Sequence, residues 1–139
     1  MDSNLKRSII LENYSNPINR KLVEDKNYIK INAKNESCID DLILMIYLED
    51  NIIKDIVFDG EACAISISAT SLMIKNLLNK NIKEALELIK NFENMINEKE
   101  YNKNLLEELN VYDEMYKQPN RKKCALLPFI SMKKELTKY

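Results

Sequence analysis

The alternation of apolar and polar residues predicts three consecutive strands in the first half of the chain. Tyr28–Ala33 alternates strictly, which is typical of a strand with one buried face. Leu42–Leu48 is apolar on both faces, and Ile52–Phe58 follows it after Asp50-Asn51, a pair that tolerates the positive φ of a tight turn. Strands connected in this way form an antiparallel meander, so we expect a three-stranded antiparallel sheet.

Helical spacing of apolar residues predicts an amphipathic helix towards each end of the chain. The first covers residues 3–14. The last covers Arg121–Lys138, and Pro128 should kink it or lie near its first turn. The stretch from Asn97 to Asn120 is polar, and we expect one short helix there, at Asn104–Leu109.

Two further helices are expected between the sheet and this polar stretch. Residues 64–74 fit a strand by alternation and a helix by spacing, but the uncharged run to Ile74 is carried on by apolar residues to Leu78, and this length favours a buried helix. Asn81 begins the next helix, because Glu84 stands where a capping box requires it. The apolar face of that helix runs from Ile82 to Ile96.

Together these elements predict the α+β class, a three-stranded antiparallel sheet flanked by helices. The length of 139 residues favours a single domain, residues 1–139. A net charge of −1 argues against binding to nucleic acid or to an anionic membrane. We find no apolar run long enough to span a bilayer and no signal peptide, so we expect a cytoplasmic protein.

The only glycine of the chain, Gly60, lies just before Cys63. A single glycine indicates a positive φ or a close approach of the backbone to another group. Cys63 then falls at a strand-to-helix junction, where the helix N-terminus favours a thiolate. An inert core cysteine is the alternative.

Three cysteines and one aspartate form the candidate metal site. Asp40 stands two residues after Cys38, while Cys63 and Cys124 belong to other elements. Three thiolates and a carboxylate would satisfy tetrahedral zinc, and the chain has no histidine to supply an imidazole ligand or a Ser-His-Asp or Cys-His active site. The spacing alone leaves buried cysteines and a solvated aspartate as an open alternative.

The segments around these residues resemble the signature segments of the SufU branch of the IscU/NifU-like family. The matching segments are Asn35–Asp40, Phe58–Ser66 and Arg121–Ala125, and Asn13–Pro17 resembles the ending of the family's N-terminal helix. Ile39 and Ala62 replace glycines that are usual in the family.

The resemblance implies a compact α+β fold and the metal ligands Cys38, Asp40, Cys63 and Cys124. It also implies that Arg121 supports Asp40, with a solvated helix-start residue as the alternative.

The function implied by the resemblance is that of a zinc-dependent sulfur acceptor. Its partner would be a PLP-dependent cysteine desulfurase of the SUF system, and Cys38 would take the persulfide sulfur. The sulfur would then pass to downstream acceptors, for iron–sulfur cluster assembly or for thiolation of tRNA. The first alternative is an IscU-type scaffold that holds an iron–sulfur cluster, although Lys123 stands where such scaffolds have a histidine. The second is a binding module with purely structural zinc.

Overall fold

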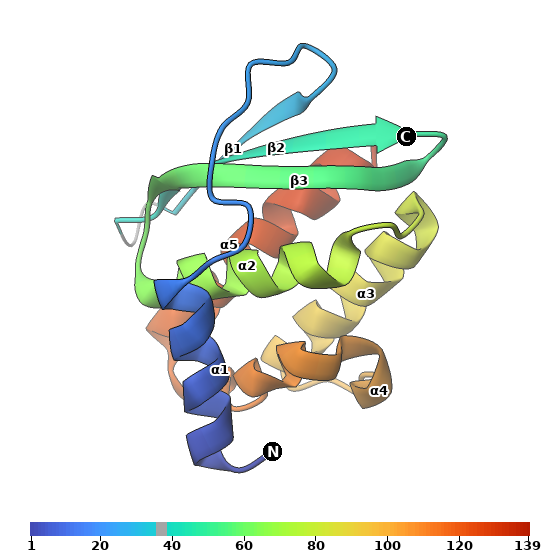
Figure 1. Ribbon diagram of the computed structural model, residues 1–139. Helices are drawn as coiled ribbons and strands as arrows, with labels where there is room; N and C mark the ends of the chain where they lie inside the picture. The colour runs from blue at the N-terminus through green and yellow to red at the C-terminus, as the bar shows by residue number, and fades with distance from the viewer. Residues whose placement is uncertain (36–38) are drawn as a thin grey trace.

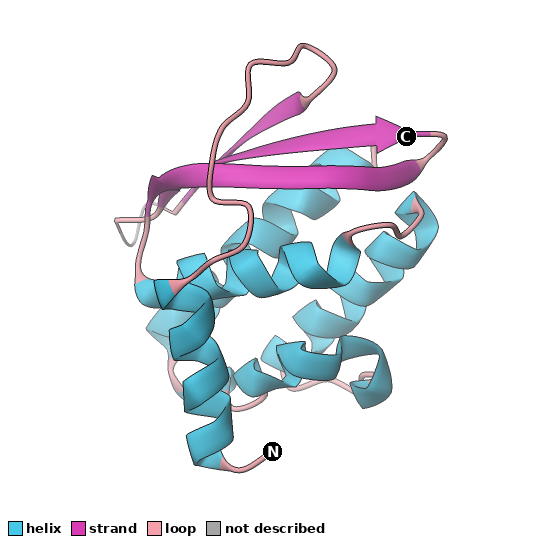
Figure 2. Ribbon diagram, in the orientation of Figure 1, coloured by secondary structure: helices cyan, strands magenta, loops and turns pink. Residues whose placement is uncertain are grey.

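The three expected strands form an antiparallel sheet. The computed structural model describes residues 1–35 and 39–139. Within them, β1 (Ile29–Lys34), β2 (Asp41–Glu49) and β3 (Ile52–Glu61) pair in the order β1-β2-β3. Figure 2 shows the helices gathered on one side of this sheet. The predicted fold class and the predicted meander are therefore confirmed.

The β2–β3 turn and the end of β3 have the conformations that their residues favour. Asp50 and Asn51 have φ values of 54° and 62°, so the β2–β3 turn uses the expected positive φ. β3 continues past Phe58, where the sequence pattern ended it, because Gly60 pairs with Leu42 of β2. The longer strand carries the chain to the helix that follows it.

The helical layer consists of α-helices and two short 3₁₀ helices. In chain order these are α1 (Ser3–Ser15), α2 (Ala64–Leu77), α3 (Ile82–Ile96), α4 (Lys103–Leu106), η1 (Glu107–Tyr112), η2 (Met115–Lys117) and α5 (Pro119–Leu136). α2 and α5 run beneath the sheet, and α1 packs against α2 (Figure 1). The ambiguous segment at residues 64–74 is thus a helix. The capping box of α3 is present, formed by Asn81 and Glu84.

The central helix α2 is largely buried, and the polar side chains among its buried residues carry hydroxyl groups. Four of its fully buried side chains are Ser66, Ser68, Thr70 and Ser71. Ser68 bonds the hydroxyl of Tyr112 in η1 at 2.6 Å, and Ser71 donates to Asn13 of α1 at 2.8 Å. These contacts satisfy buried polar groups and attach neighbouring elements to α2.

The region between α3 and α5 differs from the polar stretch that the sequence indicated. The predicted short helix is divided between α4 and η1, and the region buries several apolar side chains: Leu106, Leu109, Val111, Tyr112 and Met115. α5 begins at Pro119, slightly before the expected Arg121, and continues through Pro128. Within the described residues, no helix has the length and apolar character needed to cross a membrane.

Candidate metal centre

Three of the predicted ligands converge at the end of the sheet where β3 leads into α2. One carboxylate oxygen of Asp40 and the Sγ atoms of Cys63 and Cys124 all lie within 4.8 Å of one another. Asp40 directly precedes β2, Cys63 is the N-cap of α2, and Cys124 lies in α5. Elements far apart in sequence therefore bring together two thiols and one carboxylate.

Gly60 places β3 unusually close to the backbone beside Asp40. Its φ is +131°, and a Cβ atom there would stand 2.3 Å from the carbonyl oxygen of Asp41. A side chain would therefore collide with the backbone and strain the conformation. This is the close approach that the single glycine predicted, and it lies next to a candidate ligand.

Cys63 is positioned by the start of α2. Its backbone is extended, with φ −70° and ψ 166°, and its side chain makes no capping hydrogen bond. The thiol is half-buried and free of a disulfide. The expected strand-to-helix junction is confirmed.

Asp40 is buried, with 1% of its surface exposed, and hydrogen bonds hold its carboxylate in place. The backbone N–H of Cys63 donates to Oδ1 at 2.8 Å, and the hydroxyl of Ser66 donates to Oδ2 at 2.7 Å. Burial alone would raise the pKa of Asp40, but the hydrogen bonds from Ser66, from the Cys63 N–H and from the thiols of Cys124 and Cys63 outweigh it, and the pKa is lowered. The carboxylate is consequently ionised at neutral pH.

Cys124 is also buried and stands beside groups that oppose its ionisation. Burial raises the pKa of the Cys124 thiol well above its usual range, and the neighbouring Cys63 and Asp40 raise it further. A divalent cation would reverse this, because it compensates the charges of nearby thiolates and carboxylates. Sulfur and oxygen donors suit zinc, whose ligand atoms lie about 2.0–2.3 Å from the ion. The donor set and its crowding therefore fit a zinc ion.

Ser66 is a site residue that sequence reasoning missed. It appeared only as part of the uncharged run that indicated a buried helix. Its hydroxyl lies 2.7 Å from Asp40 and 3.0 Å from the carbonyl oxygen of Cys124. The available signal was a serine three residues after the N-cap cysteine, since serine in a helix often directs its hydroxyl to a specific partner.

The described residues provide no contact that tests the roles predicted for two further site residues. Cys38 lies outside the described residues. Arg121 is exposed in the first turn of α5, and no ion pair links it to Asp40 in the described part of the chain. Both roles remain predictions.

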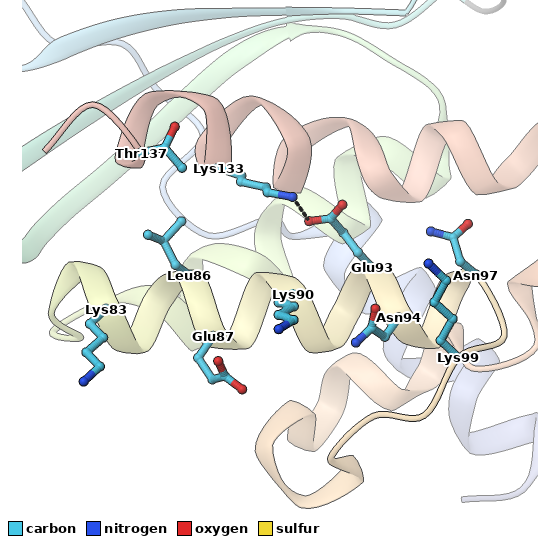
Figure 3. A pocket seen from close by; sticks show the side chains of 10 residues that line it. All are labelled: Lys83, Leu86, Glu87, Lys90, Glu93, Asn94, Asn97, Lys99, Lys133 and Thr137. Carbon is cyan, nitrogen blue, oxygen red and sulfur yellow. Dashed lines mark ion pairs between the residues drawn. The ribbon is translucent and has the colours of Figure 1, made fainter.

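A separate groove lies between α3 and α5 (Figure 3). Leu86 forms part of its wall, and Lys133 pairs with Glu93 across it at 3.1 Å. The groove contains lysine, glutamate and amide side chains but no cysteine, so it contributes no ligand to the cluster.

Comparison with known proteins identifies the family of the chain. The family model of the NifU-like N-terminal domain matches residues 5–139. The chain belongs to this family. This NifU-like chain is 33% identical over 135 residues to the zinc-dependent sulfurtransferase SufU of Bacillus subtilis, a match that covers 96% of the chain and 90% of the relative. The resemblance to SufU-type proteins is thereby confirmed.

The NifU-like chain is also similar to an IscU protein and to a solved SUF-system structure. It is 30% identical over 106 residues to the iron–sulfur cluster assembly scaffold protein IscU of Thermotoga maritima, covering 76% of the chain and 75% of the relative. Its fold matches the crystal structure of a putative SUF-system scaffold protein from Fervidobacterium islandicum, with a TM-score of 0.88 and 32% identity. That match covers 92% of this chain and 93% of the other.

Proposed function

We propose that this protein is a zinc-dependent sulfur acceptor in iron–sulfur cluster assembly. The observation that carries the proposal is the convergence of Asp40, Cys63 and Cys124 in a chain similar to SufU over almost its full length. The sulfur donor would be a PLP-dependent cysteine desulfurase of the SUF type. The proposed setting is the cytoplasm, where thiols such as Cys63 and Cys124 stay reduced.

Each residue of the site has a distinct role in this proposal. Bound zinc supplies positive charge that keeps its cysteine ligands as thiolates at neutral pH. Cys63 and Cys124, placed by α2 and α5, would hold the zinc ion. Asp40 provides an oxygen ligand, and Cys38 completes the set and serves as the sulfur acceptor. Arg121 is the proposed support for Asp40.

The sulfur transfer itself needs no outside oxidant. The thiolate of Cys38 attacks the terminal sulfur of the desulfurase persulfide and forms a new S–S bond. The original S–S bond of the persulfide breaks, and its electron pair leaves with the desulfurase cysteine as a thiolate. The outcome is a persulfide on Cys38, ready for a downstream acceptor.

A scaffold that holds an iron–sulfur cluster is the second candidate, because the Thermotoga maritima relative carries that name. The position before Cys124 is occupied by Lys123, which is exposed, and the chain has no histidine. A scaffold would take up a stable cluster during anaerobic reconstitution, whereas a sulfur acceptor would keep zinc under the same treatment.

The decisive experiment measures alanine release by the cognate cysteine desulfurase. We expect zinc-loaded protein to increase alanine release strongly, and we expect Cys38→Ser to abolish the increase while the variant stays folded. Lys54→Ala, a change at an exposed position of β3, should behave like the unmodified protein. No stimulation by zinc-loaded protein, or full stimulation by Cys38→Ser, would reject the sulfur-acceptor function.

A further inference from the structure

The hydroxyl of Ser66 has two acceptors but only one proton. Its Oγ atom lies 2.7 Å from Oδ2 of Asp40 and 3.0 Å from the carbonyl oxygen of Cys124. Ser66 is fully buried, so bulk solvent does not reach these contacts. At any moment the hydroxyl can donate to one of the two oxygens, and both belong to candidate metal ligands.

The second acceptor is available because of a proline in α5. In an α-helix the carbonyl of residue 124 accepts from the N–H of residue 128. Pro128 occupies that position inside α5 and has no N–H. The carbonyl of Cys124 therefore lacks its usual helical donor and accepts from Ser66 of α2 instead.

We propose that Ser66 is a positioning residue of the metal centre. Its hydroxyl donates alternately to the carboxylate of Asp40 and to the carbonyl oxygen of Cys124. This inference rests on the proposed zinc site. When the hydroxyl donates to Asp40, the hydrogen bonds from Ser66 and from the Cys63 N–H fix both carboxylate oxygens and orient the carboxylate as a ligand. When Asp40 leaves the metal, the hydroxyl turns to the carbonyl of Cys124 and is not left as an unpaired buried donor.

Pro128 is a part of the same arrangement. Without it, the carbonyl of Cys124 would be occupied by a helical N–H, and Ser66 would have Asp40 as its dominant partner. The proline thus leaves the carbonyl of Cys124 available as a second acceptor for the Ser66 hydroxyl. This lowers the free-energy cost when Asp40 leaves the metal.

The test compares two buried serines of the same helix. Ser66→Ala removes the hydroxyl at the site, and Ser68→Ala removes the equally buried hydroxyl that contacts Tyr112. Zinc affinity is measured by competition with a chromophoric chelator, after circular dichroism has verified that each variant is folded. We expect Ser66→Ala to weaken zinc binding about 10- to 100-fold, the usual effect of losing a partner of a metal ligand, and Ser68→Ala to leave it unchanged.

A double-mutant cycle shows whether Ser66 acts through Asp40. In an Asp40→Ala background, Ser66→Ala should change zinc affinity by no more than about twofold, because the group it orients is gone. If Ser66→Ala weakened zinc binding in the Asp40→Ala background as much as in the unmodified protein, the proposal would be overturned. Equal zinc affinities of the Ser66→Ala and Ser68→Ala variants would overturn it as well.

Pro128→Ala tests the shared proton. We expect this variant to release zinc to the chelator more slowly than the unmodified protein, because the new N–H occupies the carbonyl of Cys124. An unchanged or faster rate of zinc release would reject the proposal that the Ser66 hydroxyl alternates between Asp40 and the carbonyl of Cys124. If the unmodified protein failed to bind zinc, the proposed function would fail as well, whereas the results above reject the role of Ser66 alone.

Discussion

Cys63 donates its backbone N–H to Oδ1 of Asp40 at 2.8 Å, across a separation of 23 residues. Cys63 is the N-cap of α2, and its own side chain makes no capping bond. Asp40 therefore supplies the negative charge that favours this helix N-terminus. The contact fixes two candidate ligands relative to each other before any metal binds.

Removal of this carboxylate should lower the stability of the metal-free protein. Asp40→Ala deprives the Cys63 N–H of its partner, and we expect the free energy of unfolding to fall by about 1–3 kcal/mol. Urea denaturation followed by circular dichroism measures the loss. Asp41→Ala, at the exposed neighbouring position, should change stability by less than about 0.5 kcal/mol. Equal losses in the two variants would contradict a structural role for the Asp40 hydrogen bonds.

The two thiols of the centre should differ in reactivity when no metal is bound. Cys63 is half-buried, whereas Cys124 is 1% exposed and burial raises the pKa of its thiol. We expect iodoacetamide to label Cys63 much faster, since alkylation requires an accessible thiolate. Peptide mass spectrometry after timed labelling measures both rates, and zinc should protect both residues. In urea the two rates should become similar; faster labelling of Cys124 in the folded protein would refute this expectation.

Substitution of the single glycine should disturb the sheet next to the site. In Gly60→Ala the new Cβ would meet the carbonyl oxygen of Asp41 at 2.3 Å, at a φ of +131°. We expect a loss of about 2 kcal/mol or more, because backbone strain and overpacking act together. Thermal and urea unfolding provide the measurement, with the exposed Glu61→Ala as control. A Gly60→Ala protein as stable as the control would show that the backbone relaxes without cost.

The attachment of α1 to α2 depends on Asn13. Its side chain is buried, and its Oδ1 accepts from Ser71 and from Lys75, each at 2.8 Å. Asn13→Ala leaves both donors without this acceptor, so we expect a loss of about 1–3 kcal/mol. Hydrogen–deuterium exchange should rise first in α1. Glu12→Ala, at an exposed position of the same helix, should leave exchange unchanged.

The stability of the protein should depend on pH through Tyr28, whose hydroxyl donates to Asp55 at 2.5 Å. This hydrogen bond, together with burial, raises the pKa of Tyr28 to about 12. Because the folded pKa lies above the unfolded value near 10, the stabilisation is complete below about pH 10 and is lost as the pH rises towards 12.

The matching variant is Tyr28→Phe. Since the contact is partly exposed, it should be about 1 kcal/mol less stable than the unmodified protein at neutral pH. The difference should shrink in strongly alkaline solution. Urea titrations at several pH values measure it, and a difference that grew above pH 10 would contradict the assignment.

Much of the fold could be predicted from the sequence because its elements have clear periodicity. The alternation in β1, the turn at Asp50-Asn51 and the capping box at Asn81 are local signals, and each depends on neighbouring residues only. The region after α3 was harder, because its buried Leu109 and Tyr112 are surrounded by polar residues without a regular repeat. Their burial results from packing against distant elements.

The candidate site was only partly predictable for the same reason. Residue types and family resemblance identified Asp40, Cys63 and Cys124, which the fold brings together. The hydroxyl of Ser66 acquires its role from a carboxylate 26 residues earlier and a carbonyl 58 residues later. Such a role follows from the packing of α2 against α5 and has no periodic signal.

The burial of Tyr112 gives the protein a natural optical reporter. The chain has no tryptophan, and Tyr112 is fully buried with its hydroxyl on Ser68 and its ring edge-on to Phe92. A phenol held in this asymmetric setting produces near-ultraviolet circular dichroism that a solvated tyrosine lacks. Thiolate-to-metal charge-transfer absorption, recorded when cobalt is substituted for zinc, reports on the centre at Cys63, the N-cap of the same helix. Opening of the helical layer and loading of the metal centre can therefore be recorded as separate signals from a single unlabelled sample.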